Sequence, residues 1–317
     1  MTMIDGHGRN INKLRLSVGE SCNLSCVYCV DKIGGHQRSH DHLTVEEMID
    51  LVRILKRHGG IEKVRITGGE PLLFPGIEQL IREIARLGIE NIGLTTNAQQ
   101  LKKRVDDLKN SGLQKINVSL DSLKPAVFRR LARGGRLERT CEGIEAAVKT
   151  GLQVKINTVV LKGENEEELN DILAYALFLK SEVRFLELMK MGPLYEKETA
   201  LFVPMKTILA KIGKCYSYHP IPAETDSTAI RFRVPGGTFG IIANESNPFC
   251  ATCSRLRLTS TGKLIGCLSQ PVGIPIKHLL KAPQPEFELK SLLSQAIGYK
   301  RTVAFKGSQI GMSAIGG

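Results

Sequence analysis

Short β-branched runs alternate with helical patterns through much of this 317-residue chain, and few folds accommodate that alternation. The runs predict strands over residues 13–18, 63–66, 91–95, 115–120, 154–160 and 183–188. The segments between them predict helices over residues 44–58, 77–87, 99–111, 125–132, 140–150 and 166–180. Such units indicate an α/β fold with a parallel sheet and helical crossovers. Six units are too few for a closed eight-stranded barrel, so we expect an open, partial (βα)6 TIM-like barrel.

The pattern loosens beyond about Gly192, where Pro, Gly and polar connections become more frequent. We therefore expect a partial barrel over residues 1–192 and a smaller C-terminal region over residues 193–317 that closes it. Sites on parallel sheets gather at the carboxyl ends of the strands. The loops that follow the predicted strands are thus the first place to look for chemistry.

The chain is basic, with 44 Lys and Arg against 32 Asp and Glu and a formal net charge of +12. This excess indicates an anionic partner. Nucleic acid is not favoured, because Trp is absent and aromatic residues make up only 5%. No apolar run approaches the roughly 18 residues of a membrane helix, and the opening MTMIDGHGRN lacks a signal-peptide core. We expect a cytoplasmic protein with no membrane partner.

Three cysteines, Cys22, Cys26 and Cys29, follow the first predicted strand with C-x3-C-x2-C spacing. A 4Fe-4S cluster normally takes four Cys ligands, so three thiolates would leave one iron open for a substrate or cofactor. Structural zinc remains an alternative, since nearby histidines could supply a fourth ligand; they are His36, His40 and His42. Disulfides fit a reducing compartment poorly.

The second predicted strand ends in Thr67-Gly68-Gly69-Glu70-Pro71. Adjacent glycines let the backbone approach a ligand closely, and the carboxylate of Glu70 could accept hydrogen bonds from an ammonium group. An ordinary tight turn between strand and helix is the alternative. The preceding three-cysteine loop favours the ligand site.

A second set, Cys250, Cys253 and Cys267, has C-x2-C-x13-C spacing and again lacks a fourth cysteine. It indicates either a second open 4Fe-4S cluster or a zinc site completed by a distant histidine. Arg255 and Arg257 lie between its members and would share a face of an extended segment. Two guanidinium groups beside a cluster suit recognition of a triphosphate.

Cationic residues also recur at inward positions of four predicted strands, which carry Arg15, Arg65, Lys155 and Arg184. Alternation along a strand places Lys63 on the same face as Arg65. Burying such side chains without an anion is costly. The sequence therefore predicts a binding site for a polyanion inside the sheet.

Together these residues resemble the GTP 3′,8-cyclases, the molybdenum cofactor biosynthesis protein A family of the radical S-adenosylmethionine (SAM) superfamily. The resemblance covers nearly the whole chain. It includes both cysteine sets, GGEP, TTN, VSLDS, RFLELM, the Arg-x-Arg pair and the terminal Gly316-Gly317.

The resemblance implies roles for the matched residues. Cys22, Cys26 and Cys29 would hold the 4Fe-4S cluster that binds SAM, and Cys250, Cys253 and Cys267 would hold a second 4Fe-4S cluster facing the guanine base. SAM would contact Tyr28, Gly69, Glu70, Ser119 and Met189. GTP would contact Arg15, Lys63, Arg65, Thr96, Lys155, Arg184, Arg255 and Arg257. The catalytic residues would be Arg255, Arg257, Gly316 and Gly317.

In that family one electron splits SAM into methionine and a 5′-deoxyadenosyl radical, which removes the C3′ hydrogen of GTP. Bonding of C3′ to C8 of guanine then yields (8S)-3′,8-cyclo-7,8-dihydroguanosine 5′-triphosphate, the first intermediate of molybdenum cofactor biosynthesis. The implied partners are a flavodoxin or ferredoxin-type reductant and cyclic pyranopterin monophosphate synthase, which takes the product. A homodimer is an open option.

Two segments depart from the family pattern. Gly19-Glu20-Ser21 stands where Thr-Asp-Arg is usual, and Val30-Asp31 stands where Met-Pro is usual. A diverged radical SAM paralogue acting on another nucleotide, a peptide or RNA is therefore an alternative. A zinc-stabilised, basic nucleic-acid-binding protein is the alternative from a different class.

Overall fold

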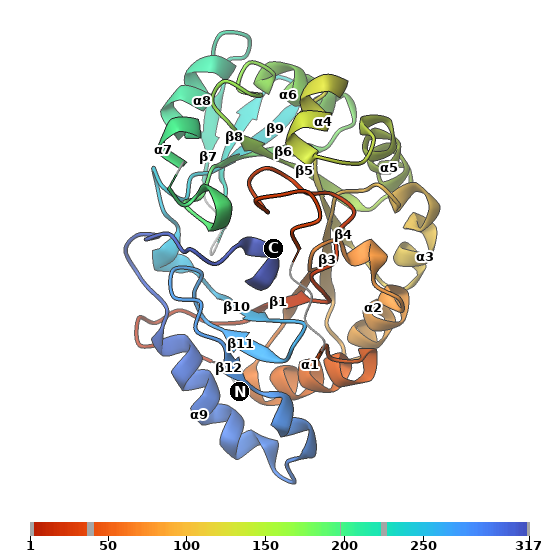
Figure 1. Cartoon of the computed structure of the whole chain (residues 1–317), viewed down its shortest axis with the longest axis vertical. Helices are drawn as coiled ribbons and strands as arrows, with labels where there is room; N and C mark the ends of the chain where they lie inside the picture. The colour runs from red at the N-terminus through yellow and green to blue at the C-terminus, as the bar shows by residue number, and fades with distance from the viewer. Residues whose placement is uncertain (1–2, 37–40, 197, 223–226, 316–317) are drawn as a thin grey trace.

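The computed structural model of the chain describes residues 3–36, 41–196, 198–222 and 227–315. Within these ranges the strands form one curved sheet, with the order β12-β11-β10-β1-β2-β3-β4-β5-β6-β9-β8-β7 (Figure 1). The strands of the predicted barrel are β1 (Lys13–Ser17), β2 (Lys63–Thr67), β3 (Asn91–Thr96), β4 (Lys115–Ser119), β5 (Gln153–Val160) and β6 (Glu182–Glu187). The predicted α/β fold with six parallel strands in sequence order is confirmed.

Strands from the C-terminal region lengthen this sheet at both edges. These strands are β7 (His219–Ile221), β8 (Ile230–Val234), β9 (Gly237–Ile242), β10 (Arg255–Leu258), β11 (Lys263–Ile265) and β12 (Ile274–Pro275). β10 pairs in parallel with β1, and β9 pairs in parallel with β6. The sheet is therefore shared between the two parts that the sequence distinguishes.

Helices cover the outer side of the curved sheet (Figure 1). They are α1 (Val45–Gly59), α2 (Ile77–Arg86), α3 (Val105–Asn110), α4 (Pro125–Ala132), α5 (Leu137–Lys149) and α6 (Leu169–Phe178), followed by α7 (Glu198–Leu201), α8 (Met205–Ile212) and α9 (Pro285–Gly298). α1 begins at the capping box formed by Thr44 and Glu47 and ends before Gly60, which adopts the left-handed conformation.

The predicted helix over residues 99–111 is wrong in one respect, because it is two pieces. A 3-10 turn, η2 (Leu101–Lys103), precedes α3, and Arg104 lies between them with φ −123°. The guanidinium of Arg104 donates to both carboxylate oxygens of Glu78 and to the carbonyl of Leu72. These tertiary contacts hold a non-helical backbone that local propensity does not predict.

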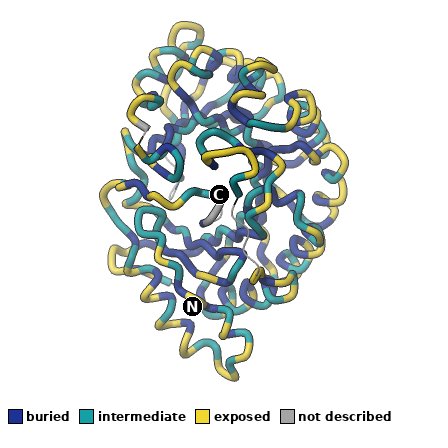
Figure 2. The backbone as a smooth tube through the Cα atoms, viewed as in Figure 1, coloured by how far each residue is buried: buried dark blue, intermediate teal, exposed yellow. Residues whose placement is uncertain are grey.

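The apolar core lies between the sheet and the helices, where Leu14, Leu16, Val64 and Ile66 are almost fully buried. Figure 2 shows buried stretches along the strands and exposed ones on the outer helices and loops. The alternate side chains of β1 and β2 face the other way, into the space that the sheet encloses. In the described residues no helix is both long and apolar enough to cross a membrane.

Candidate active site

The first cysteine loop follows β1 at its carboxyl end, as the sequence predicts, and α4 holds it in place. Ser25 and Val27 donate their amides to the carbonyls of Ala132 and Leu131, at 2.9 and 3.0 Å. Within the loop, the amide of Cys29 donates to the carbonyl of Cys26 at 2.9 Å. The loop is therefore built on a neighbouring helix end as well as on its own strand.

The three thiols of this loop fit a cationic cluster. Burial raises the pKa of Cys26, and Asp121 and the other two cysteines of the loop raise it further. Burial, Glu70 and Cys29 likewise raise the pKa of Cys22 to about 11. Half-buried thiolates that repel one another require a positive partner, which iron supplies.

A zinc ion shared with the nearby histidines has less support. Nε2 of His36 lies 2.7 Å from the carbonyl oxygen of Leu24, and His40 lies outside the described residues. Across the described part of the chain, no three His, Cys, Asp or Glu side chains are arranged to hold a single metal ion. A four-iron cluster instead takes each thiolate at a separate iron.

The GGEP segment packs directly against the cysteine loop. The amides of Gly69 and Glu70 donate to the carbonyls of Gly19 and Ser21, at 2.7 and 2.8 Å. A Cβ at Gly69 would lie 2.3 Å from the carbonyl oxygen of Ser21. Glycine is therefore required at this position because the backbone of the cysteine loop approaches it closely. Contact of Gly69 with SAM remains a prediction.

Glu70 and Thr96 are buried and bonded to each other. The Thr96 hydroxyl donates to Glu70 at 2.6 Å, and the amides of Asn97 and Leu72 donate to the same carboxylate at 2.7 and 3.0 Å. Burial raises the pKa of Glu70 despite these donors. Thr96 thus lies with the predicted SAM residue Glu70 rather than with the cationic residues described below.

Tyr28 is anchored by a residue that the sequence reasoning missed. Its hydroxyl donates to Oδ2 of Asp121 at 2.6 Å, and the amide of Val159 donates to Oδ1 at 2.9 Å. Burial raises the pKa of Asp121 to about 6 even though both donors lower it. Asp121 belongs to the VSLDS segment that the sequence singled out for Ser119, and that proximity was an available signal.

The remaining predicted SAM residues also lie at carboxyl ends of strands. Ser119 is the last residue of β4. Met189 follows β6 and packs in a small apolar cluster with Met191, Ile265 and Ile315. Because parallel strands end at one edge of the sheet, Tyr28, Gly69, Ser119 and Met189 belong to the same rim.

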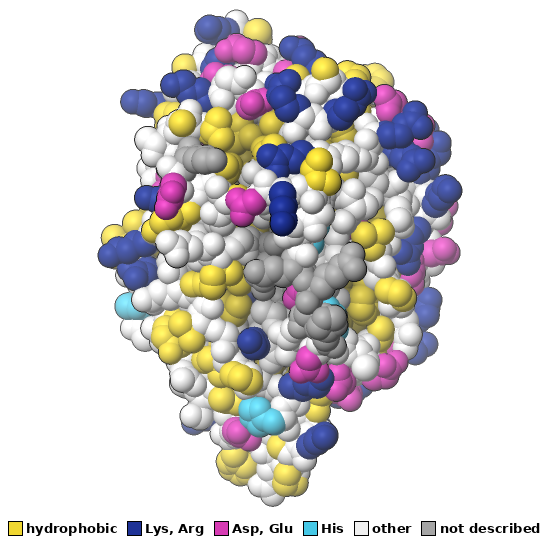
Figure 3. Space-filling model, viewed as in Figure 1, with side chains coloured by type: hydrophobic (Ala, Val, Ile, Leu, Met, Phe, Trp, Pro, Cys, Tyr) yellow, Lys and Arg dark blue, Asp and Glu magenta, His cyan; other side chains and the backbone are white. Residues whose placement is uncertain are grey.

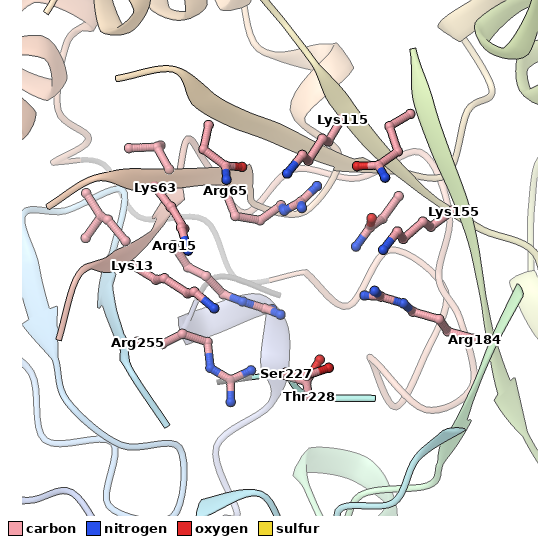
Figure 4. A pocket seen from close by; sticks show the side chains of 15 residues that line it. Lys13, Arg15, Lys63, Arg65, Lys115, Lys155, Arg184, Ser227, Thr228 and Arg255 are labelled. Atoms are coloured by element: carbon pink, nitrogen blue, oxygen red, sulfur yellow. The ribbon is translucent and has the colours of Figure 1, made fainter. Parts of the chain in front are cut away.

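A cationic cavity of about 290 Å³ lies on the inner side of the sheet. We use the name for the space bordered by Lys13, Leu14, Arg15, Lys63, Val64, Arg65, Asn91, Lys115, Asn117, Gln153, Lys155, Arg184, Ser227, Thr228 and Arg255. Figure 4 shows the labelled Lys and Arg side chains pointing into it from different sides. On the face drawn in Figure 3, by contrast, Lys and Arg are dispersed among other side chains.

Strand register explains how these cations come together. In one row across the strands, Lys13 of β1 pairs with Arg255 of β10 and with Lys63 of β2. Two residues further along each strand, Arg15 pairs with Arg257 and with Arg65. The predicted common face of Lys63 and Arg65 is confirmed by the cavity that both line. Lys13 and Lys115 also line it, although the sequence analysis did not assign them to the substrate.

The cations of this cavity repel one another. Burial, then Arg257, Arg255 and Arg65, hold the pKa of Arg15 well below its ordinary value. Burial and Arg184 lower the pKa of Arg65 to about 10. Next to the cavity, burial and Arg255 lower the pKa of Arg257, which does not itself line it, to about 9. A guanidinium does not readily release its proton, so an anion is the effective means of relieving this repulsion.

One side of the cavity carries its own carboxylate. Glu182 is the first residue of β6. Its Oε1 lies 3.4 Å from Nζ of Lys155 and 2.9 Å from Nε of Arg184, and its Oε2 lies 2.8 Å from Nε of Arg231. The sequence reasoning missed this residue, which neutralises part of the charge on β5 and β6. The opposite side, formed by β10, β1 and β2, contributes Arg255, Arg15 and Arg65 to the cavity.

The second cysteine set lies at the other end of the strands. Cys250 and Cys253 precede β10, and Cys267 follows the antiparallel β11, so all three are near the amino end of β10. Burial raises the pKa of Cys253, but Arg255 and Lys300 outweigh it and bring the value to about 6. A thiolate stabilised by cations is a suitable metal ligand.

This second set adjoins the cationic cavity through Arg255. That residue lines the cavity, and its Nη2 lies 3.6 Å from Sγ of Cys253. The two cysteine sets thus stand near opposite ends of β1 and β10, with the arginines of both strands between them. A substrate in the cavity would lie between two metal centres.

Comparisons with known proteins show the family of this chain. Residues 16–176 match the family described as the Radical SAM superfamily, and residues 181–305 match the family described as Molybdenum Cofactor Synthesis C. The chain is 38% identical over 302 residues to a GTP 3′,8-cyclase of Synechocystis sp., covering 94% of this chain and 90% of the relative. It is 39% identical over 304 residues to a GTP 3′,8-cyclase of Moorella thermoacetica, with 94% of each covered.

Among solved structures, Streptococcus suis SuiB bound to S-adenosylmethionine matches with a TM-score of 0.65 and 16% identity, covering 93% of this chain and 70% of SuiB. At that identity the likeness concerns the fold alone. The family relation rests on the sequence matches, which extend over both cysteine sets. The chain therefore belongs to the radical SAM superfamily and, within it, to the family of the GTP 3′,8-cyclases.

Proposed function

We propose that this chain converts GTP to (8S)-3′,8-cyclo-7,8-dihydroguanosine 5′-triphosphate, using SAM and two 4Fe-4S clusters. The observation that carries the proposal is the cationic cavity, placed between two incomplete cysteine sets. Its charge suits a triphosphate. The similarity to GTP 3′,8-cyclases over 94% of the chain supports the same substrate.

Each end of the cavity has a separate task in this proposal. Cys22, Cys26 and Cys29 hold the cluster on which SAM binds, and that pair supplies the electron and the group that accepts the C3′ hydrogen of the nucleotide. Cys250, Cys253 and Cys267 hold the second cluster on the base side. The protein itself contributes orientation, charge and exclusion of water.

The row of Arg257, Arg15 and Arg65 carries the triphosphate in this proposal. These side chains stand on adjacent strands in register, so successive phosphates can bind to successive guanidinium groups. Arg15 and Arg65 line the cavity together with Lys63, Lys155 and Arg184, and Arg257 adjoins it through its pairing with Arg15. Holding the ribose still between these contacts and SAM aligns C3′ for hydrogen removal.

The C-terminal segment is a further part of the proposed site. Gly316 and Gly317 lie outside the described residues, but Ile315 before them is buried in the apolar cluster with Met191 and Ile265. Figure 1 shows the end of the described chain beside the space enclosed by the sheet. We assign Gly316 and Gly317 to the catalytic site on the resemblance to the GTP 3′,8-cyclases.

The same proposal extends to partners. A one-electron reductant of the flavodoxin or ferredoxin type would supply the first cluster, and a cyclic pyranopterin monophosphate synthase would take the product. The expected compartment is the cytoplasm. A homodimer can be tested by sedimentation of the reconstituted protein.

Anaerobic reconstitution followed by assay tests the proposed reaction. The protein should bind about eight irons and eight sulfides per chain, as two 4Fe-4S clusters require. With dithionite, SAM and GTP it should form 5′-deoxyadenosine and the cyclised nucleotide. SAM cleavage that is independent of GTP would point to a paralogue with another substrate. A colourless protein that binds two zinc ions would contradict the proposal that the chain is a radical SAM enzyme.

A further inference from the structure

Lys300 is a buried lysine that contacts the second cysteine set. Only 6% of its surface is exposed, and its ammonium has three acceptors. It lies 2.9 Å from the carbonyl oxygen of Arg255, 3.2 Å from that of Gly266 and 3.3 Å from Sγ of Cys253. All three acceptors belong to the segments that carry Cys253 and Cys267.

These contacts with described residues include no carboxylate. A buried ammonium without an anionic partner is costly, and two carbonyl dipoles compensate for it only in part. The sulfur of Cys253 can supply the missing negative charge when it is a thiolate bound to iron. The ammonium is thus placed as the partner of a metal-bound sulfur.

The end of α9 determines where Lys300 points. The helix ends at Gly298, and the amide of Lys300 donates to the carbonyl of Ile297 at 2.8 Å. A Cβ at Gly266 would lie 1.8 Å from the carbonyl oxygen of Ala296, so the helix end packs directly against the backbone that precedes Cys267. The ammonium therefore reaches the cysteines from a rigid support.

We propose that Lys300 is a positioning residue that donates a hydrogen bond to the metal-bound thiolate of Cys253 and thereby raises the reduction potential of the second cluster. Hydrogen bonds to sulfur and nearby positive charge both favour the added electron. The inference rests on the proposed function, since it needs a cluster at the second set. Lys300 does not line the cationic cavity, so its role is separate from phosphate binding.

The test compares Lys300→Met with Lys290→Met in fully reconstituted protein. Lys290 is exposed on α9, so its replacement removes the same charge without touching a cysteine. Redox titration followed by electron paramagnetic resonance reads both clusters, and the first cluster serves as an internal reference. We expect Lys300→Met to lower the ratio of reduced to oxidised second cluster about tenfold at a fixed potential, equivalent to about 59 mV.

The first cluster in Lys300→Met, and both clusters in Lys290→Met, should titrate as in the unmodified protein. An unchanged second cluster in Lys300→Met, or an equal change in both clusters, overturns the proposal. If Lys300→Met fails to assemble the second cluster, the potential of that cluster is measured in Lys300→Arg instead, because arginine keeps the positive charge and the hydrogen-bond donor. A native-like potential in that variant supports the proposal, and a lowered one contradicts it.

Iron analysis separates this result from the fate of the proposed function. If the unmodified protein binds about eight irons but Lys300→Met leaves the potential of the second cluster unchanged, only the inference about Lys300 is rejected. About four irons, all at the first set, rejects the second cluster and with it both statements.

Discussion

Gly93 shows how much the cationic cavity depends on a residue without a side chain. A Cβ at this position would lie 2.3 Å from Nη1 of Arg65, whose guanidinium lies across the neighbouring strand. Nη1 also donates to the carbonyl of Leu94 at 3.3 Å. The glycine therefore lets Arg65 extend along β3 into the cavity.

We predict that Gly93→Ala displaces Arg65 and weakens GTP binding. A lost hydrogen bond to a charged group corresponds to about 1.5–3 kcal/mol, or a roughly tenfold to hundredfold higher Kd. Isothermal titration calorimetry measures it. Gly298→Ala is the matched control, since a Cβ there meets nothing within 4 Å. Equal affinities for both variants would show that Arg65 does not bind the nucleotide.

Asp121 gives a second prediction, concerning pH. Burial raises the pKa of this carboxyl from 3.8 to about 6, so the folded chain holds its proton more tightly than the unfolded one. The resulting stabilisation is complete below about pH 4 and disappears as the pH rises through 6, a change of about 3 kcal/mol.

Urea unfolding of the metal-free chain and of Asp121→Asn, at several pH values from 4 to 7, measures this change. The free energy of unfolding of the unmodified chain, relative to Asp121→Asn, should fall with rising pH. The exposed Asp171 supplies the control substitution Asp171→Asn. A constant difference between the chain and Asp121→Asn would mean that Asp121 titrates normally.

Among the elements, the loops after β1 and β2 form one unit. The amides of the GGEP segment bond to carbonyls of the cysteine loop. Glu20, which departs from the usual family pattern, links this unit to the C-terminal region, because its carboxylate accepts a hydrogen bond from the hydroxyl of Ser260 at 3.3 Å. At Glu20, the replaced family position is therefore used for a contact with the C-terminal region.

We predict that Gly69→Ala selectively impairs the first cluster. The added methyl group would push Ser21 away and move Cys22, while the second cysteine set stays intact. Iron content should fall from about eight toward about four per chain, with the loss confined to the first cluster's resonance signal. Gly19→Ala, in the same contact but with open space at its Cβ, should keep both clusters. Loss of both clusters in Gly69→Ala would indicate general misfolding.

The elements also show what a sequence can and cannot predict. The strands β1 to β6 follow from local β-branched runs and their spacing, which depend on nearby residues. The pairing of β10 with β1 joins residues such as Arg257 and Arg15 that are far apart in the chain, and no local pattern encodes it. The contacts of Lys300 and Glu182 are likewise tertiary, so the cysteine and arginine motifs were predictable but their supporting residues were not.

Considered as a whole, the molecule gathers positive charge on the inner side of its sheet. Arg15, Arg65 and Arg257 stand on adjacent strands, and their mutual repulsion opposes the compact state. A ligand that binds only the folded chain stabilises it according to its affinity. Polyphosphates should therefore act as stabilisers even without a nucleoside.

We predict that the thermal midpoint of the metal-free chain rises in the order phosphate, pyrophosphate, tripolyphosphate at equal concentration. Each added phosphate relieves more of the repulsion in the cavity. Differential scanning fluorimetry measures the midpoints, and added salt should reduce the shift by screening. Arg65→Met should shrink the shift, and Lys290→Met should not. Equal shifts for the three anions would argue against a row of phosphate contacts.

The position of β10 beside β1 has a consequence for biosynthesis. While a ribosome makes this chain, β1 emerges early, yet its partner at residues 255–258 emerges only after most of the protein. Until then one edge of the nascent sheet stays open, and open edges pair readily with other chains. The first cysteine loop can form during that interval, whereas the arginine row is complete only near the end of translation. The first cysteine loop and the arginine row are therefore completed at different times during synthesis of the chain.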